Sequence, residues 1–287
     1  MSFKIAIASG KGGTGKTTVS VNLFKWIIQH WTEKVQLVDC DVEEPNDHIF
    51  LPEYLLSHQQ EVTQLIPKID LNNCTFCRKC VDWCEFNAIV VIPPVQFAEV
   101  NNSLCHSCGA CLIACEDDAM IEYPHPIGKA NFYKNGNGSG LLEGVLKIGS
   151  SMQTMLIGEI KKLADPEAEV IIFDSPPGTS CPVVESVADS DYVILVTEPT
   201  PFGLHDLKLT VDLIRELKID FGVIVNKSGL GTDDIYEYLE NENIELLGKI
   251  PFDKEYASNY AKGDLSIKNE IFINQYHSIG KALKLRR

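Results

Sequence analysis

Several common sequence features are missing from this 287-residue chain. Its first residues, MSFKIAIASGKGG, have no charged stretch followed by an apolar segment and a small-residue cleavage site, so they do not indicate a secretory signal. No apolar run approaches the length that a helix needs to span a bilayer. We therefore expect a cytoplasmic protein and do not expect a membrane partner.

Positive charge is also scarce, since 25 Lys and Arg residues stand against 40 Asp and Glu residues, for a formal net charge of −15. Nucleic-acid binding needs clustered Lys and Arg, so we expect no nucleic-acid partner. Only the C-terminal KALKLRR is locally basic. Such a tail can contact anionic lipid, but basic residues are also favoured at the end of any helix, and this one carries no Trp or Phe. A terminal helix is the favoured interpretation.

Cysteine, in contrast, is abundant: ten are present, and eight of them fall between Cys74 and Cys115. In a cytoplasmic protein this clustering points to metal or redox chemistry rather than to disulfides. The eight form two copies of C-x2-C-x2-C-x3-C, in CTFCRKCVDWCEFNAIV and CHSCGACLIACEDDAMI. The copies superpose with an offset of 31 residues, including the next Glu and an Ala three residues later. Two copies of one small loop-helix-strand unit are predicted.

The cysteine spacing is typical of bacterial ferredoxins with two 4Fe–4S clusters. Three cysteines in a tight loop hold one cluster, and the fourth, on the helix behind, reaches the other. The predicted ligand sets are Cys74, Cys77, Cys80 and Cys115 for one cluster, and Cys105, Cys108, Cys111 and Cys84 for the second. Zinc is the alternative, but zinc sites usually pair cysteines as two separated C-x2-C clips. Glu85 and Glu116 stand where ferredoxins have Pro, and carboxylates there favour low potentials.

Outside the cysteine-rich segment the chain has the pattern of a parallel α/β protein. A strand at 3–8, a glycine-rich loop, a helix at 17–31 and a strand at 35–38 form a βαβ opening. The later runs VIIFDSPPG, YVILVTEP and FGVIVNKSG are unbroken and apolar, as in strands covered by helices on both faces. Helices are expected at GLHDLKLTVDLIREL and DDIYEYLENEN, with a flexible loop at KNGNGSG.

The predicted fold class is therefore α/β: a doubly wound, mainly parallel-sheet P-loop NTPase with a small inserted α+β domain like a bacterial ferredoxin. The α/β alternation stops near Leu51 and resumes after about Pro126. We place the P-loop domain at 1–61 and 125–287 and the inserted domain at 62–124.

The loop in ASGKGGTGKTTVS fits the phosphate-binding pattern G-x-x-x-x-G-K-[ST]. Its backbone N–H groups would surround the phosphates of ATP at the N-terminus of a helix. Lys16 would neutralise the β- and γ-phosphate oxygens, and the Thr17 hydroxyl would bind Mg²⁺. The predicted nucleotide-binding residues of the loop are Gly10, Gly12, Gly13, Thr14, Gly15, Lys16, Thr17 and Thr18. Lys11 is a second lysine that the pattern does not require.

Three aspartates follow predicted strands at the edge where open α/β sheets bind ligands. Asp39 and Asp174 are predicted to hold Mg²⁺ with Thr17, either directly or through water. Asp41 would orient the water that attacks the γ-phosphate. Gly178 has no side chain and can approach that phosphate closely.

KGGTGKTT with its extra lysine, LVDCDVEEPN and FDSPPGTSCPV resemble the deviant-Walker-A ATPases of the MinD/ParA group, which includes the nitrogenase iron protein and the Mrp-type iron–sulfur carriers. With the cysteine motifs, nearly the whole chain resembles MinD-superfamily ATPases that contain an inserted ferredoxin domain. The resemblance implies a face-to-face dimer, either a homodimer or a heterodimer with a related ATPase, in which Lys11 reaches the other protomer's phosphates like an arginine finger. It also implies that Asn226 and Pro251 border the adenine.

Cys181 lies seven residues past Asp174, where the nitrogenase iron protein is similar in carrying a ligand for its bridging cluster. The matching upstream region has no second cysteine, and two protomers would supply two thiolates rather than four. We therefore expect Cys181 to be a small buried residue at a helix start. The C-terminal cysteine pair of the Mrp-type carriers has no counterpart here.

These features favour an ATPase whose nucleotide cycle gates electron transfer through both clusters, with the segment after Asp41 acting as a switch. From Asp70 to Glu122, eight acidic residues stand against two basic ones, which favours a redox acceptor or client protein with a basic patch. The alternative is an ATPase that assembles or delivers an iron–sulfur or metal cofactor. We expect all eight motif cysteines to be buried, which argues against a labile cluster. A spatial regulator on membranes or DNA is disfavoured by the acidity.

Overall fold

The computed structural model describes residues 2–136, 138–266 and 269–286. The chain divides into two compact units, the first made of Met1–Gln59, Ala130–Val145 and Ile157–Arg287 and the second of Gln60–Lys129 and Leu146–Leu156. The second unit contains the segment 62–124 that was expected as an insertion. It also takes in residues 60–61, 125–129 and 146–156, which the sequence placed with the P-loop domain.

Over the described residues, one nine-stranded sheet has the strand order β11-β10-β9-β1-β8-β2-β7-β6-β3. Its strands are β1 (Phe3–Ala8), β2 (Val35–Asp39), β3 (Leu55–Ile69), β6 (Met120–Lys134), β7 (Gly140–Leu146), β8 (Val170–Asp174), β9 (Tyr192–Thr197), β10 (Phe221–Ser228) and β11 (Leu246–Pro251). The strands from β11 to β7 pair in parallel. Every strand predicted from an apolar run is present, and the parallel sheet is confirmed. The KNGNGSG loop between β6 and β7 includes residue 137, which lies outside the described residues.

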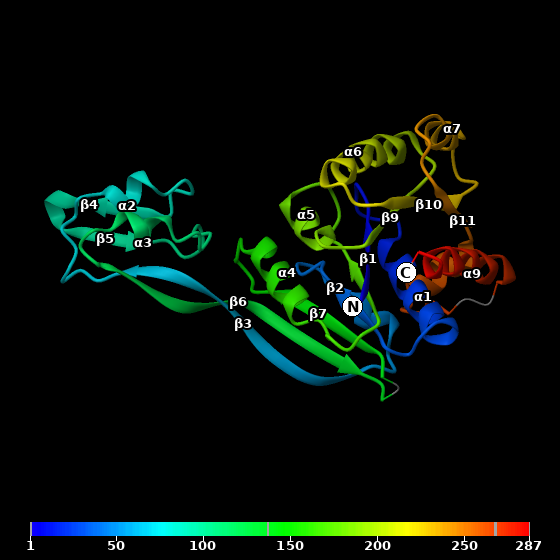
Figure 1. Cartoon of the computed structure of the whole chain (residues 1–287), viewed down its shortest axis with the longest axis horizontal. Coiled ribbons are helices and arrows are strands. Elements are labelled where there is room, and N and C mark those ends of the chain that lie inside the picture. Colours follow the sequence, from blue (N-terminus) through cyan, green and yellow to red (C-terminus); the bar gives the residue numbers. More distant parts are fainter. Residues whose placement is uncertain (1, 137, 267–268, 287) are drawn as a thin grey trace. The chain divides into compact units, whose positions relative to one another are not determined.

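Helices cover both faces of this sheet. They are α1 (Lys16–His30), η1 (Asp47–Phe50), α4 (Gln153–Lys162), α5 (Cys181–Val187), α6 (Pro201–Leu217), α7 (Asp234–Asn241), α8 (Lys254–Tyr260) and α9 (Glu270–Lys284). Figure 1 shows α1 and α9 together on one side of the sheet and α5 and α6 on the other. The helices predicted near 17–31, 203–217 and 233–243 are α1, α6 and α7.

The central strands β1, β8 and β9 are mostly apolar because both of their faces are buried. Ile5, Ile7 and Ile172 belong to the core cluster that contains the apolar faces of α1 and α9. Phe173, the next residue on β8, is also buried but lies outside that cluster, and Lys161 of α4 stands over its ring. Each such buried side chain stabilises the fold by about 1.5–3 kcal/mol. This arrangement confirms a doubly wound sheet.

The second unit is small and shows the internal repeat. Its elements besides the ends of β3 and β6 are α2 (Lys79–Asp82), β4 (Ile89–Ile92), η2 (Pro93–Val95), β5 (Phe97–Val100) and α3 (Ala110–Ala114). Left-handed backbone conformations recur with the 31-residue offset at three pairs of positions, Phe76 and Ser107, Arg78 and Gly109, and Asn87 and Asp118. The two copies therefore have the same local fold, each with a loop, a short helix and a strand.

The two copies exchange equivalent hydrogen bonds. The backbone N–H of Asp70 in the first copy donates to the carbonyl of Ala119 in the second at 2.7 Å. The N–H of Asn101 in the second copy donates to the carbonyl of Ala88 in the first, also at 2.7 Å. These reciprocal bonds relate the copies by an approximate two-fold axis.

Residues 146–156 join the second unit through two hydrogen bonds. The backbone N–H of Lys147 donates to the carbonyl of Ile127 at 2.9 Å, and the Ser151 hydroxyl donates to the carbonyl of Ser103 at 2.7 Å. No hydrophobic periodicity marks this segment, so its position depends on contacts distant in sequence.

Candidate functional site

The glycine-rich loop lies between β1 and α1, and its shape requires glycine. Gly13 and Gly15 have positive φ angles of 77° and 99°. A Cβ on Gly15 would stand 2.2 Å from Asn226 Nδ2, and one on Gly10 would stand 2.5 Å from the Asp206 carbonyl oxygen. Larger residues would therefore strain or displace the loop.

The loop leads directly into the first turn of α1. Lys16 begins the helix and is 8% exposed, and Thr14 and Thr18 are also buried. Gly12, in contrast, has open space where a Cβ would be. Since the first N–H groups of a helix have no partner within the helix, this end of α1 can bind an anion. The structure thus brings the predicted phosphate-binding residues together.

Lys11 is held within its own chain. Its Nζ donates to Glu198 Oε1 at 2.7 Å, and Lys227 Nζ donates to Glu198 Oε2 at 2.8 Å. Lys227 also donates to the carbonyl of Gly13 at 2.7 Å, so it braces the loop. Burial acts to raise the pKa of Glu198, but the two lysines outweigh it and lower that pKa. The sequence did not indicate a role for Glu198 or Lys227, although Glu198 directly follows β9 at the ligand edge of the sheet.

The three predicted aspartates also meet at this edge. Thr17 Oγ1 donates to Asp174 Oδ2 at 3.0 Å. Asp39 is fully buried and accepts backbone N–H groups of Asp41, Asn46 and Asp47 at 3.0, 2.8 and 3.2 Å. Its carboxylate therefore shapes the segment that follows β2.

Burial sets the ionisation of these carboxyl groups. It raises the pKa of Asp41 to about 6, with Lys16 acting in the opposite direction. It raises the pKa of Asp39 well above the usual range, and the nearby charge of Asp174 adds to this shift. Burial also raises the pKa of Asp174, again opposed by Lys16. Such a cluster of buried carboxyl groups favours a cation or protons at the site.

Asp47 is a fourth carboxylate of this cluster that sequence analysis did not identify. It is the first residue of η1, and its side chain is fully buried beside those of Asp174 and Asp39. Its only signal in the sequence is its place shortly after DCDVEEPN, where an acidic residue on a surface loop would look the same.

Three further residues were predicted to contact the nucleotide: Gly178, Asn226 and Pro251. Gly178 has a φ of 104°, and its N–H donates to the Ser9 carbonyl at 2.9 Å. Asn226 donates from Nδ2 to the Thr14 carbonyl at 2.7 Å, so its side chain supports the loop. Pro251 ends β11 and is half-buried. The adenine contacts of Asn226 and Pro251 remain predictions.

The prediction for Cys181 is half wrong. It does begin a helix, α5, but its side chain is exposed. The side of α5 that packs on the protein carries Val183, Ser186 and Val187 instead.

The expectation that all eight motif cysteines are buried is also wrong. Only Cys105 and Cys111 are buried, and Cys77 and Cys108 are exposed. A unit with a two-stranded sheet and two short helices has too little surrounding structure to enclose them all.

The thiol groups nevertheless lie in two sets. Burial raises the pKa of Cys80, and the thiols that raise it further are those of Cys74, Cys77 and Cys115. Burial likewise raises the pKa of Cys111 to about 11, with contributions from Cys105, Cys108 and Cys84. Each set therefore takes three cysteines from one copy and one from the other. Among the described residues, no group of three or more His, Cys, Asp or Glu side chains is arranged to hold a single metal ion.

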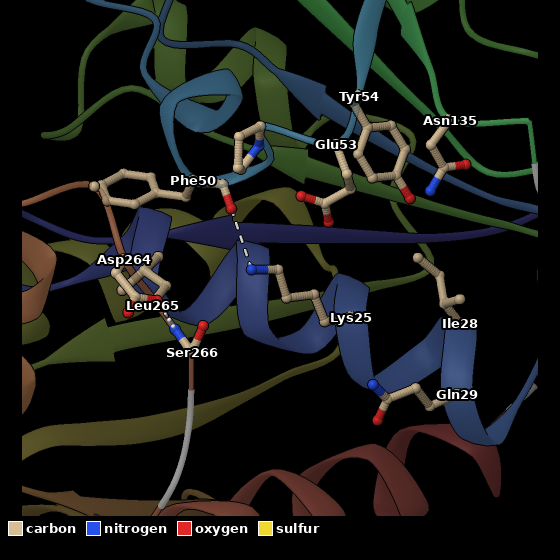
Figure 2. A pocket seen from close by; sticks show the side chains of 12 residues that line it. Lys25, Ile28, Gln29, Phe50, Glu53, Tyr54, Asn135, Asp264, Leu265 and Ser266 are labelled. Carbon is tan, nitrogen blue, oxygen red and sulfur yellow. Dashed lines mark hydrogen bonds between the residues drawn. The ribbon is translucent and has the colours of Figure 1, made fainter.

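A separate cavity of about 490 Å³ lies beside α1. Figure 2 shows Lys25 reaching the Phe50 carbonyl, with a hydrogen bond of 3.1 Å, while Glu53 and Asp264 stand nearby. None of the predicted site residues lines it.

The first four residues of the basic C-terminal segment, 281–284, end α9, and residue 287 lies outside the described residues. Tyr276, Ile279 and Leu283 bury the apolar face of this helix in the core, and Lys284 Nζ donates to the His30 carbonyl at 3.2 Å. These contacts favour the terminal-helix interpretation. None of the helices in the described residues is long and apolar enough to cross a membrane.

A glycine loop after the first strand, Lys and Thr at the helix start, and an aspartate at the end of a neighbouring strand define a P-loop nucleotide-binding protein. Comparison with known proteins specifies the family. The chain matches the CobQ/CobB/MinD/ParA nucleotide binding domain over residues 5–267 and belongs to this family. It is therefore a nucleotide-binding ATPase of the MinD/ParA type, and the predicted family is confirmed.

Individual relatives agree with this assignment. An uncharacterized protein of Methanocaldococcus jannaschii is 33% identical over 92% of this chain and 91% of its own length. An iron-sulfur cluster carrier protein of the same organism is 24% identical over 91% of this chain and 76% of its own length. The septum site-determining protein MinD from Pyrococcus horikoshii, solved with Mg-ADP, has the same fold, with a TM-score of 0.58 and 19% identity over 100% of this chain and 99% of that one.

Proposed function

We propose that this protein hydrolyses ATP with Mg²⁺ and couples the nucleotide cycle to electron transfer through two 4Fe–4S clusters to a partner protein. The observation that carries the proposal is the grouping of the thiols. The neighbours of Cys80 and of Cys111 each include one cysteine from the other copy, as crossed ligation of two clusters requires. The same chain carries the phosphate-binding loop.

The residues at the sheet edge fit a Mg²⁺ ion. The ion prefers hard oxygen ligands, and Thr17 Oγ1 and the Asp174 carboxylate lie together there beside Asp39. Asp174 Oδ1 has no hydrogen-bond partner in the described part of the chain, which leaves it free for the metal or its water. When bound, Mg²⁺ would neutralise charge on the β- and γ-phosphates.

The chain's own groups supply the remaining steps of hydrolysis. Lys16, at the start of α1, neutralises phosphate charge, and the N–H groups of the loop orient the phosphates. Asp41 accepts a hydrogen bond from the attacking water and orients it toward the γ-phosphate. With a pKa of about 6, Asp41 is ionised at neutral pH, as this role requires.

Lys11 adds a step between two protomers. Its ion pair with Glu198 must open before Lys11 can reach the nucleotide of a second protomer, whether that protomer is identical or a related ATPase. The negative phosphates of ATP would then replace Glu198 as its partner. This exchange makes dimer formation depend on bound nucleotide.

The cysteine unit fits iron–sulfur ligation in its local chemistry. The N–H of Ala88 donates to Cys84 Sγ, and that of Ala119 donates to Cys115 Sγ, both at 3.3 Å. Such bonds stabilise thiolate charge and tune the potential of a bound cluster. A bound 4Fe–4S cluster would accept and donate one electron at a time.

The test is EPR spectroscopy of anaerobically purified, reduced protein, first with ADP and then with ATP. We expect iron and acid-labile sulfide for two clusters, together with cluster signals that change with the nucleotide. A Lys16→Ala variant should keep the clusters and lose the change. Protein without labile sulfide would refute the cluster proposal, and identical spectra with ADP and ATP would refute the coupling.

The exposure of Cys77 and Cys108 favours a second candidate, delivery of a cluster to a client protein. The relatives named iron-sulfur cluster carrier proteins agree with it. Incubation with an apo-ferredoxin separates the two functions, because delivery moves iron to the acceptor and electron transfer leaves it in place.

A further inference from the structure

Asp47 has two links to the residues at the ligand edge of the sheet. Its backbone N–H donates to Asp39 Oδ2 at 3.2 Å, and its carboxylate contacts that of Asp174. Its side chain is completely buried, so water does not screen its charge. A buried carboxylate beside two others is unfavourable unless a donor or a cation compensates for its charge.

Within the described residues, the one compensating contact is a hydrogen bond between the Asp47 and Asp174 carboxyl groups, which requires a proton on one of them. When both groups are ionised, neither carboxylate oxygen of Asp47 has a hydrogen-bond donor in this part of the chain, and neither does Oδ1 of Asp174. Buried polar groups in folded proteins are rarely left this way, and a bound ion often accounts for the exceptions. The unpartnered oxygens lie together beside the end of β8.

Glu143 on β7 is another buried carboxylate, and side chains of the same chain surround it. It is 2% exposed, and its oxygens lie 2.5 Å from His48 Nδ1, 2.8 Å from Asn131 Nδ2 and 3.1 Å from the Tyr133 hydroxyl. Its charge is thus fully compensated by side chains. The contrast with Asp47 indicates that the carboxylate oxygens at the sheet edge bind an ion or water that is not part of the chain.

We propose that Asp47 is a further residue of the Mg²⁺ site, where its carboxylate acts with those of Asp39 and Asp174 to hold the hydrated ion that accompanies the nucleotide. This inference rests on the proposed nucleotide-dependent function. Mg²⁺ usually keeps several of its waters, and a carboxylate without other partners accepts hydrogen bonds from them. Because Asp47 begins η1, occupation of the site would also fix the segment between β2 and β3.

The test is a titration with Mn²⁺, a paramagnetic substitute for Mg²⁺, followed by EPR in the presence of ADP. Asp47→Asn keeps the size of the side chain and removes its charge. We expect it to weaken Mn²⁺ binding by about 10-fold, as for other residues that support a metal. An affinity equal to wild type would overturn the proposal.

Glu143→Gln is the matched control, since it neutralises a neighbouring buried carboxylate that already has partners. It should leave the Mn²⁺ affinity unchanged and lower the melting temperature. Asp47→Asn should melt at or above wild type without metal, because the Asn amide can donate to Asp174 in place of a protonated carboxyl group and the substitution removes repulsion. A metal-free Asp47→Asn protein that melts well below wild type, or equal loss of Mn²⁺ affinity in both variants, would show a general structural effect and overturn the proposal.

The same titration separates this inference from the proposed function. Failure of the wild-type protein to bind Mn²⁺ with ADP would refute the nucleotide site itself. Normal binding by both wild type and Asp47→Asn would refute only the role of Asp47.

Discussion

The phosphate-binding region and the cysteine unit hold their chemical groups in different ways. Lys16, Asp39 and Asp174 are almost completely buried, at positions where strands and a helix of a large sheet end. The motif cysteines surround a small apolar cluster whose buried members are Ile69, Ile89, Val91 and Cys111, with several other thiols packed against it.

The difference in burial indicates how the phosphate-binding site and the cysteine unit each obtain their shape. The large sheet buries enough apolar surface to position the nucleotide-binding residues before any ligand arrives. The cysteine unit buries little, and its thiols form part of its own core, so a bound cluster would act as a structural element. Under the proposed function, the first site is therefore pre-formed, whereas the second depends on a bound cluster.

Removal of the clusters is the strongest way to break this comparison. Chelation of iron, or the substitution Cys80→Ala, should unfold residues 60–129 and leave the first unit folded. Hydrogen exchange measures both effects, with complete loss of protection expected in the second unit. Cys181→Ala is the control, because this exposed cysteine lies outside both sets. Full protection in the iron-free protein would show that the second unit is also pre-formed.

Substitution of Lys16 tests whether the phosphate-binding site forms independently of the cysteine unit. Lys16→Ala should reduce ATP hydrolysis by about 100-fold or more, because the β- and γ-phosphate charge is no longer neutralised. Cluster absorbance and the melting temperature should stay close to wild type. If the visible spectrum of the clusters changes as well, the two sites do not form independently of each other.

The smallest expected effect concerns the Lys11–Glu198 ion pair. Glu198→Gln weakens the attraction for Lys11 and should tighten ATP-dependent dimer formation by about fivefold, as the loss of about 1 kcal/mol in a partly exposed pair implies. Sedimentation velocity with ATP measures this change. Glu242→Gln, which breaks the surface pair with Arg215, is the matched control and should have no effect. Weaker dimerisation of Glu198→Gln would mean that Glu198 supports the interface.

The same pair has a defined pH dependence. The pKa of Glu198 is lowered in the folded chain, so the stability it contributes is present above its unfolded pKa and is lost as the pH falls through its folded pKa. The stability difference between wild type and Glu198→Gln should therefore be measurable at pH 7 and smaller at about pH 4, below the usual glutamate pKa. Thermal melts at both pH values test this, and a difference that does not shrink in acid would contradict it.

Much of the fold could be predicted because its signals are local. Strands β8, β9 and β10 include unbroken apolar runs, β1 and β2 are largely apolar, and helix α1 follows a glycine loop whose spacing is set by phosphate geometry. The 31-residue repeat is visible as identical cysteine spacing and returns as identical backbone conformations. Long strands β3 and β6 were not predicted, because each contains Pro and polar residues and has no regular alternation.

The parts that escaped prediction depend on contacts between distant residues. Glu198 and Lys227 contact the loop from β9 and β10, far along the chain from Lys11. The exposure of Cys181 depends on which side of α5 faces the protein. The residues 146–156 join the second unit through individual hydrogen bonds that have no sequence pattern.

The sequence by itself determined the family, the phosphate-binding loop and the repeated cysteine spacing, because each requires particular residue types at short fixed intervals. The tertiary structure alone decided which carboxylates are buried together and that Lys11 is paired with Glu198. It also decided that, within the described residues, the ionised Asp47 carboxylate has no hydrogen-bond donor while that of Glu143 has three side-chain partners. The physical reason is that burial and charge compensation depend on neighbours brought together by folding. An aspartate on an exposed loop and one buried beside other carboxylates are the same residue type in the sequence.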